Sequence, residues 1–385
     1  MNNGILAPQP FSSAVSMMDS TMEPLLGNAQ PTPVPYHYPQ SYDFRIGNND
    51  GISGKDFVFV VDTTILGSTT ISILCRGDLG DRFSIDWGDG TYGAIAPVGT
   101  QRTRSFETVL TFTSFVSTPI IHTYTKHGIY TIILRGRFSV DSIGSSESLT
   151  AILSYGDTNY RSTTLYHGTD TNLVYVPPQI PTSVTDLTSC FISLTKFNHP
   201  NIALWDVSRI QNMVGLFSEN RGFNQDLDKW KDKVGNVNDF TYAFFNSSFN
   251  GSLSGWVLGD VDCSLMFGNC NSFVGKGLNN WDVTGVQNVN SMFTDCASLN
   301  VNLSGWNLCN CYDMSNFMSN TNIGSDNYDI LLNSWELSST GNPIKPWETS
   351  INVDFGSAKY TTASSGARQR LVDYGWTITD GGFQA

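Results

Sequence analysis

The chain has 385 residues, of which 34 are acidic and 21 basic, and its formal net charge is −13. Charged residues make up 14% of the chain, whereas soluble proteins average about 25%, so Asn, Ser, Thr and Gly carry most of the polar surface. Nucleic acid and anionic membranes are excluded as partners because both require a basic surface. Coiled coils are disfavoured because they need charged flanks. At about 150 residues per domain, the length predicts two to three domains.

Membrane insertion is not expected, because no apolar run approaches the ~18 to 20 residues of a membrane helix. A secretory signal is not expected either, since the first basic residue is Arg45 and prolines interrupt the segment before it. Seven cysteines are an odd number at ordinary density, which does not suggest a disulfide scaffold. We therefore expect a soluble chain without an export signal of its own.

Residues 1–51 form a separate compositional unit with few charges and seven of the 15 prolines. The stretch 31–39 is expected to be extended polyproline II, because proline fixes φ and lacks an N–H. The segment also carries large apolar side chains: Met17, Met18, Leu25, Leu26, Tyr36 and Tyr38. Disordered tails are usually charged and poor in aromatic residues. The preferred interpretation is therefore an arm that lies along a partner protein, with a disordered tail as the alternative.

Residues 52–140 are predicted to contain short β-strands separated by turns. Four runs combine β-branched and aromatic residues: 57–61, 69–74, 83–87 and 130–134. The Asp89-Gly90 pair indicates a hairpin, because glycine accepts positive φ.

Two motifs in this region carry a family resemblance. The first is Trp87-Gly88-Asp89-Gly90-Thr91, and the second runs from His122-Thr123-Tyr124 to Tyr130-Thr131. WGDGT followed by HTYxxxGxYT resembles the polycystic-kidney-disease (PKD) domain. The resemblance implies an immunoglobulin-like β-sandwich that acts as a spacer or binding module on a cell or particle surface.

Residues 141–335 form a repeat array. Tryptophans recur at intervals of 25, 26, 25, 25 and 29 residues: Trp205, Trp230, Trp256, Trp281, Trp306 and Trp335. A Phe-Asn step recurs at Phe197-Asn198, Phe223-Asn224 and Phe249-Asn250. A unit of this length cannot bury its own aromatic residues, but stacked units bury them in one continuous column. The recurrent Asn is expected at a tight turn, where its side chain satisfies backbone groups of the adjacent coil.

The segments 205–224 and 281–300 follow the pattern WDVSxVxNMxxMFxxCxxFNxxL, which resembles BspA-like leucine-rich repeats. The resemblance implies a leucine-rich-repeat solenoid. The coils beginning at Trp230 and Trp256 depart from the pattern, so their register is open.

Residues 336–385 are expected to cap the exposed end of this array. The run 364–374 predicts a short helix that Gly375 terminates, and 376–382 predicts a closing strand. The predicted fold class is thus mainly β: an immunoglobulin-like sandwich, then a leucine-rich-repeat solenoid with a C-terminal α/β cap.

The ionisable residues of the strand-rich region have structural interpretations. The chain has five histidines: His37, His122, His127, His167 and His199. We expect His122 and His127 to form hydrogen bonds between hairpins. Asp86 and Asp89 could act as an acid and base pair, but both flank turn glycines, where Asp caps its own backbone. Calcium binding by Asp78, Asp81, Asp86 and Asp89 lacks a fixed ligand spacing.

The other candidate motifs are weak as well. Cys270 and Cys296 occupy one position in successive repeats, which is typical of a small buried slot with an inert thiol. Zinc binding by Cys296, Cys309 and Cys311 lacks a CxxC pair or spaced histidines. Arg76-Gly77-Asp78 spells an adhesion tripeptide but follows a predicted buried strand. No phosphate loop, nucleophile elbow or metalloprotease motif occurs. We predict no catalytic residue, no metal site and no cofactor, and assign no residue to ligand binding.

These features predict a non-enzymatic protein on the surface of a bacterial virus. The arm, residues 1–51, would dock on other virion structural proteins, the sandwich would form a stalk, and the solenoid would be displayed. Such a protein is a capsid decoration or a fibre that binds host-surface glycan or protein, or stabilises the shell. The same module combination resembles that of phage structural proteins.

Two other classes remain open. The first alternative is a bacterial cell-surface adhesin. The second is a carbohydrate-active enzyme, which would need carboxylates clustered along one face, whereas Asp206, Asp232, Asp260 and Asp282 are scattered. The sequence leaves homo-oligomerisation open.

Overall fold

The computed structural model describes residues 55–65, 67–78, 81–89, 110–111, 118–144, 148–156, 172–336 and 351–385. The expected arm, residues 1–51, lies outside the described residues. Strands and turns dominate the described part, with two α-helices, α1 (Ser325–Glu336) and α2 (Ser365–Asp373), near its C-terminal end. No sheet among these residues closes into a barrel. The expected mainly β fold is therefore confirmed.

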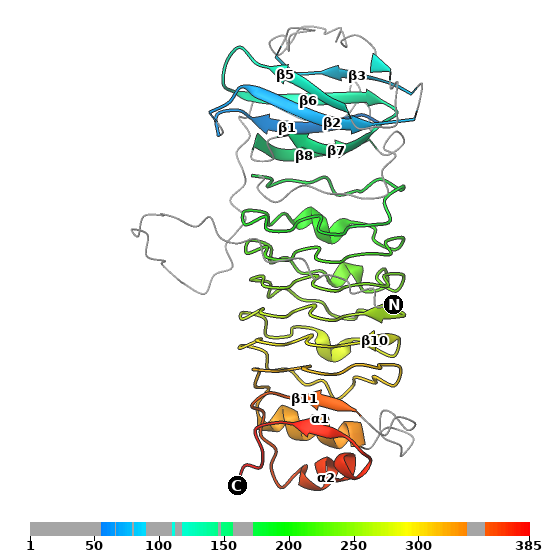
Figure 1. The fold of residues 1–385 in the computed structure, drawn as a ribbon, viewed down its shortest axis with the longest axis vertical. Helices are drawn as coiled ribbons and strands as arrows, with labels where there is room; N and C mark the ends of the chain where they lie inside the picture. Colours follow the sequence, from blue (N-terminus) through cyan, green and yellow to red (C-terminus); the bar gives the residue numbers. More distant parts are fainter. Residues whose placement is uncertain are drawn as a thin grey trace, which may run out of the picture. The chain divides into compact units, whose positions relative to one another are not determined.

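The first described region, residues 55–156, holds two antiparallel sheets (Figure 1). One has the strand order β4-β3-β6-β1-β8 and the other β5-β2-β7. The bounds are β1 Phe57–Asp62, β2 Thr70–Arg76, β3 Arg82–Asp86, β4 Leu110–Thr111, β5 Thr118–Thr123, β6 Ile129–Gly136, β7 Ser139–Gly144 and β8 Leu149–Tyr155. Strands occupy all four of the runs predicted from residue types.

Strand β1 is an interior strand of the larger sheet. All six of its residues are buried, and it pairs with β6 on one edge and β8 on the other. Strand β2 of the smaller sheet alternates instead, with Ile71, Ile73 and Cys75 buried and Thr70 and Arg76 exposed. This alternation places one face of the smaller sheet against the core and leaves the other to solvent.

The strand-rich region extends beyond its expected boundary at residue 140. Strand β7 crosses that boundary and β8 lies after it, and they pair with β2 and β1 respectively. The run 149–155 is apolar, so the sequence did not distinguish it from the first repeat. The second edge of β1 requires a partner because an unpaired buried strand leaves backbone groups unsatisfied. The repeat region follows directly: Val174 N–H donates to Thr150 O, and Ile152 N–H donates to Tyr175 O, each at 2.9 Å.

Residues 172–336 wind into successive coils that run parallel to one another (Figure 1). One Asp or Asn in each coil bridges to its equivalent in the next, and we call this series the Asp/Asn ladder: Asp186, Asn212, Asp239, Asp262, Asn288 and Asp313. Each Oδ1 accepts a hydrogen bond from the backbone N–H two residues later, at 2.7–2.9 Å. Strands β9 (Val261–Asp262) and β10 (Val286–Asn288) include part of this ladder.

Two left-handed residues follow each ladder position, three and seven residues later. Their φ values are 53–62°. The first column is Ser189, Gly215, Tyr242, Leu265, Ser291 and Asn316, and the second is Ser193, Glu219, Asn246, Asn269, Asp295 and Asn320. The first five residues of both columns donate their backbone N–H to a carbonyl of the next coil. This repeated turn conformation explains why the coils are linked throughout by hydrogen bonds and yet contain little extended strand.

The six repeating tryptophans are buried, as the repeat spacing predicts. The indoles of Trp256, Trp281 and Trp306 stack with centroids 5.4 and 5.7 Å apart. Each of the six Nε1–H groups donates to a carbonyl of the preceding turn, at 2.6–3.2 Å. The column therefore combines apolar burial with a hydrogen bond for each buried indole.

The recurrent Asn of the Phe-Asn step links neighbouring coils, as predicted. Asn198 Oδ1 accepts from the N–H of Asn224 at 2.9 Å, and Asn224 Oδ1 accepts from the N–H of Asn250 at 2.7 Å. Asn250 Oδ1 continues the series with the N–H of Val274 at 3.1 Å. The short 3-10 helices η2 (Pro200–Leu204), η3 (Asp228–Trp230) and η4 (Leu278–Asn280) follow in their coils.

The C-terminal residues extend the hydrogen bonding between coils and then end the array. Strand β11 (Asn352–Asp354) accepts from the last coil, because Met318 N–H donates to Asp354 O at 2.8 Å. Strand β12 (Thr377–Thr379) pairs with β11 in parallel. The predicted helix at 364–374 is α2, and the strand predicted within 376–382 is β12. Helix α1, which carries Trp335, was not predicted.

Close approach of neighbouring coils makes Gly285 a sensitive position. A Cβ atom on Gly285 would lie 2.3 Å from Gly259 O, whereas one on Gly305 would lie 3.6 Å from its nearest neighbour, Asn279 O. We expect Gly285→Ala to lower the free energy of unfolding by about 1–3 kcal/mol, since the backbones must separate. Gly305→Ala is the matched control and should change it by less than about 0.5 kcal/mol. Urea unfolding followed by circular dichroism measures both, and equal effects would contradict this packing.

Candidate functional site

Trp87 and Asp89 of the first sequence motif lie just after β3 and contact His122 of β5, from the second motif. His122 Nε2 lies 2.7 Å from Asp89 Oδ2, and the imidazole stacks on the Trp87 ring with centroids 4.6 Å apart. Tyr124 donates its hydroxyl to Trp87 O at 2.9 Å, and burial, with Asp89 and other acidic neighbours, raises the pKa of this phenol. His127 Nδ1 bonds to Thr63 O at 2.8 Å. The predicted hydrogen bonds between hairpins are therefore confirmed for both histidines.

Of the remaining histidines, His199 is described and has a different role. His199 caps helix η2 by accepting from the N–H of Asn201 at 3.3 Å, and burial lowers its pKa. His37 and His167 lie outside the described residues.

Asp86 and Asp89 have different hydrogen-bond partners in the structure. Asp86 Oδ1 accepts from the N–H of Gly88 at 2.9 Å, as expected of a turn residue, while Asp89 bonds to His122. Asp81 Oδ2 accepts from the N–H of Asp78 at 3.1 Å in another exposed turn. Within the described residues, no three His, Cys, Asp or Glu side chains are placed to hold a metal ion.

Cys270 and Cys296 occupy one buried slot in successive coils, as the repeat predicts. Cys270 Sγ donates to Phe244 O at 2.9 Å and Cys296 Sγ donates to Phe267 O at 3.0 Å. Thr321 uses the same slot one coil later and donates to Phe293 O at 2.7 Å. Burial raises the pKa of Cys270 to about 11 and that of Cys296 further. Both thiols are therefore structural hydrogen-bond donors.

Thiol labelling tests this assignment. Six of the seven cysteines are buried, and Cys309 is half-buried. Because thiolates are the reactive species, we expect one fast-reacting thiol per native chain at pH 8 and seven after denaturation. Ellman's reagent counts the thiols, and mass spectrometry identifies Cys309. Rapid native labelling of Cys270 or Cys296 would contradict the buried slot.

Cys311 is buried and donates to Asp313 O at 3.3 Å, so its sulfur also has a structural contact.

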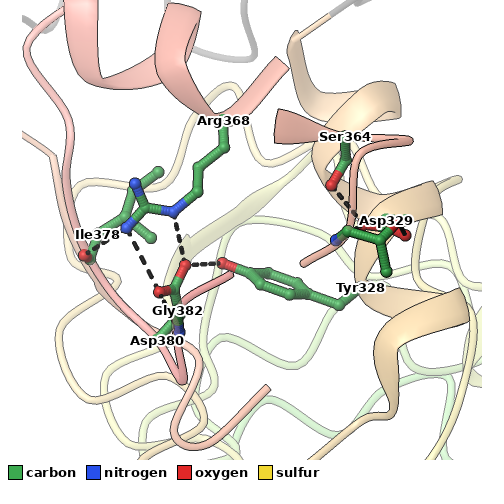
Figure 2. A network of polar contacts seen from close by, with 8 residues as sticks. Tyr328, Asp329, Ser364, Arg368, Ile378, Asp380 and Gly382 are labelled. Atoms are coloured by element: carbon green, nitrogen blue, oxygen red, sulfur yellow. Dashed lines mark hydrogen bonds and ion pairs between the residues drawn. The ribbon is translucent and has the colours of Figure 1, made fainter. Parts of the chain in front are cut away.

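A polar network of the C-terminal region surrounds Asp380 (Figure 2). Tyr328 of α1 donates its hydroxyl to Asp380 Oδ2 at 2.8 Å, and Arg368 Nε of α2 donates to the same oxygen at 2.7 Å. Arg368 Nη2 also reaches Ile378 O at 3.3 Å. Helix α2 therefore provides a donor for a backbone group of β12. Covering a terminal strand in this way prevents edge-to-edge pairing, so the network serves to end the array.

A second carboxylate, Asp329, joins α1 to the start of α2. It accepts hydrogen bonds from Thr361 N–H at 2.9 Å, from the Thr361 hydroxyl and from the Ser364 hydroxyl. Burial opposes ionisation of Asp329, but these hydrogen bonds together outweigh it and hold its pKa below the ordinary value of 3.8.

The lowered pKa of Asp329 predicts a pH dependence of stability. Ionised Asp329 stabilises the folded chain above its ordinary pKa of 3.8, and this contribution is lost as the pH falls through the lower folded pKa. We expect Asp329→Asn to be less stable than wild type at pH 7 and to lose less stability between pH 5 and 3. Urea unfolding at several pH values measures the difference. Parallel pH profiles would contradict the assignment.

The four scattered carboxylates do not form a common site in the structure. Asp206 lies 3.7 Å from Arg209 and 3.9 Å from Lys233. Asp282 accepts from Thr284, Asp260 from Gln287, and Asp232 lies 4.0 Å from Lys231. Each carboxylate thus has its own local contacts.

The Arg76-Gly77-Asp78 triplet begins at the exposed end of β2.

One surface feature was missed from the sequence. In the left-handed column that starts at Ser189, two neighbouring coils carry the bulky residues Tyr242 and Leu265 where others carry Ser, Gly or Asn. Phe245 lies beside them, with its ring centroid 5.2 Å from that of Tyr242. All three side chains are half-buried. An alignment of the repeats on their ladder residues would have found this departure, three residues after the ladder position.

Comparison with known proteins bears on the repeat region. Residues 180–276 and 261–350 match the model of a family described as Mycoplasma protein of unknown function, DUF285. The chain therefore contains a BspA-like repeat region. No curated protein and no solved structure gives a significant match. No helix of the described residues has the length and apolarity needed to cross a membrane.

Proposed function

We propose that this chain is a non-enzymatic surface protein of a bacterial virus, a capsid decoration or fibre that displays its repeat region. The observation that carries the proposal is the coil-to-coil hydrogen bonding of residues 172–336. The ladder, the left-handed turns and the tryptophans use polar groups to hold successive coils in register. Side chains that point outward are thereby presented at fixed intervals, which suits a rigid binding or shell-stabilising surface.

In the proposed architecture, the two sheets of residues 55–156 form a PKD-like immunoglobulin sandwich that serves as a stalk. Support comes from the contacts of Trp87 and Asp89 with His122, which join the two separate sequence motifs. The repeat region is a leucine-rich-repeat solenoid, and residues 351–385 with α1 form its α/β cap.

A binding role is supported over catalysis by the contacts of the ionisable groups. Tyr124, Cys296 and Tyr328 have strongly raised pKa values because they are buried. Each donates to a backbone carbonyl or a neighbouring carboxylate within the fold. Perturbed pKa values are often a sign of catalysis, but these groups act as structural donors.

Anchoring is assigned to residues 1–51 on the basis of composition. The segment is rich in proline, carries large apolar side chains and has few charges, which suits an extended arm that pairs with another virion protein. Homo-oligomerisation on the particle is compatible with this arrangement.

A bacterial cell-surface adhesin is the second candidate function. The observation that favours it is the match to a family described from Mycoplasma, a bacterium, rather than from a virus. In an adhesin the repeat region would bind host or bacterial surface molecules, and residues 1–51 would have no particle to dock on.

Deletion of residues 1–51 separates the two functions. We expect the deletion to abolish incorporation into purified virus particles while circular dichroism of the remaining chain stays unchanged. The full-length Tyr312→Ala variant is the control, because Tyr312 is 62% exposed and far along the chain from the arm. Unchanged incorporation of the deletion variant would contradict the anchoring role.

A further inference from the structure

The strongest unexplained feature of the described surface is a cluster of three side chains on two adjacent coils. We define the Tyr242 platform as Tyr242, Phe245 and Leu265. Tyr242 has φ 60° and Leu265 has φ 55°, a conformation that bulky L-residues rarely adopt. Ser189, Gly215, Ser291 and Asn316 fill the same column in the other coils. Small residues are therefore sufficient for the fold, and backbone strain of this kind concentrates at ligand-binding sites.

Phe245 gives the platform its shape. Its ring lies edge-on to Tyr242, with centroids 5.2 Å apart and an interplanar angle of 88°. In the next coil the equivalent position is Gly268, where an added Cβ would lie 3.1 Å from both the Phe245 ring and the Leu265 side chain. The absence of a side chain at Gly268 therefore leaves room for Phe245 and Leu265. The three side chains remain half-buried, so part of each faces solvent.

Neutral hydrogen-bonding groups accompany the platform. Asn246 and Asn269 follow in the second left-handed column of the same two coils. Neither side-chain amide, nor the Tyr242 hydroxyl, has a hydrogen-bond partner among the described residues. The adjoining residues of that column are acidic, Glu219 on one side and Asp295 on the other. Neither left-handed column contains Lys or Arg, which disfavours anionic ligands.

We infer that the Tyr242 platform binds an uncharged saccharide. An aromatic face accepts the apolar C–H face of a sugar ring, as in binding sites that combine aromatic walls with a few placed polar groups. An amide offers both donors and an acceptor, which matches hydroxyl groups that donate and accept. This inference rests on the proposed function, since it assigns the ligand class of the displayed repeat region.

The test uses the purified full-length chain and immobilised neutral oligosaccharides built from glucose, galactose, mannose and N-acetylglucosamine, with sialylated and sulfated oligosaccharides as charged comparisons. We expect binding to at least one neutral member and at least a tenfold loss of affinity in the double variant Tyr242→Ser, Phe245→Ser. Serine occupies the equivalent positions in other coils, Ser189 for Tyr242 and Ser218 for Phe245, so this variant should keep the wild-type circular dichroism. Asn246→Gly with Asn269→Gly should also weaken binding, because it removes the amides at positions whose left-handed backbone glycine adopts without strain.

Tyr312→Ala is the matched control, because it removes an exposed aromatic residue outside the platform, and it should bind as wild type does. The inference is overturned if no neutral oligosaccharide binds, if binding survives the double serine variant, or if charged oligosaccharides bind better. Particle incorporation is measured separately. If no saccharide binds but the chain is incorporated into particles normally, the proposed function still stands. If the chain binds a saccharide but is absent from particles, only the virion assignment is refuted.

Discussion

Replacement of Trp281 by Ala is expected to lower the free energy of unfolding by about 3–5 kcal/mol, the usual effect of removing a large buried aromatic side chain. Trp281 is 4% exposed and stacks between Trp256 and Trp306. Its Nε1–H donates to Leu253 O at 2.6 Å. The substitution therefore leaves a cavity in the column and an unsatisfied carbonyl. Urea unfolding followed by tryptophan fluorescence and circular dichroism measures the change.

Two further variants separate the contributions. Trp281→Phe retains an aromatic ring but loses the hydrogen bond to Leu253 O, so we expect a smaller loss than for Trp281→Ala. Tyr312→Ala removes an aromatic side chain that is 62% exposed and should change stability by less than about 0.5 kcal/mol. If Trp281→Ala were no more destabilising than Tyr312→Ala, the tryptophan column would not be the core of the repeat region.

Asp380→Ala is expected to destabilise the chain by about 3–5 kcal/mol, because removing one partner of a buried ion pair leaves the other uncompensated. The Asp380 side chain is 3% exposed and that of Arg368 is 19% exposed. Without Asp380, the Tyr328 hydroxyl also loses its acceptor. Repeat arrays depend on their terminal caps, so the loss should begin at the C-terminal end. Urea unfolding measures its size and hydrogen exchange locates it.

Asp373→Ala provides the matched control for Asp380→Ala. Asp373 is the last residue of α2, but it is exposed and accepts one hydrogen bond, from Gln369 at 2.9 Å. We expect a change below about 0.5 kcal/mol. In Asp380→Ala, exchange should accelerate first in α2 and β12, and later in coils near Trp205. Uniform acceleration along the whole repeat region would contradict a cap that protects one end.

The repeat region could be predicted from the sequence because its signal is large and local. Tryptophans at nearly constant intervals mark the buried column directly, and the Asn of each Phe-Asn step marks an inter-coil hydrogen bond. The motif HTYxxxGxYT likewise predicted that His122 would bond across hairpins. In each case a distinctive residue type in a recognisable pattern marks the contact that it makes.

Other features depend on contacts that the sequence does not mark. Strand β8 could not be separated from the first repeat, because its apolar pattern fits either environment and its pairing with β1 is non-local. The Asp/Asn ladder was missed because its members mix two residue types at intervals of 23 to 27 residues. The Tyr242 platform was missed for the same reason, since its unusual residues become visible once the ladder aligns the coils.

The functional assignment rests on different information from the fold. Hydrogen bonds explain how coils are held in register, and the Asp380 network explains how the array ends. The rigid coils support the display role, and the proposed place on a virus particle is supported by the proline-rich composition of residues 1–51 and by the combination of a strand-rich region with a repeat region.

Quantitative mass spectrometry of purified virus particles and of cell envelopes from the same culture tests the proposed location most directly. The account predicts that the chain is recovered in particles at a fixed number of copies per particle. A high number identifies a capsid decoration, and a low number identifies a fibre. Absence from particles, with recovery in the cell envelope, would contradict the virion proposal and support the adhesin.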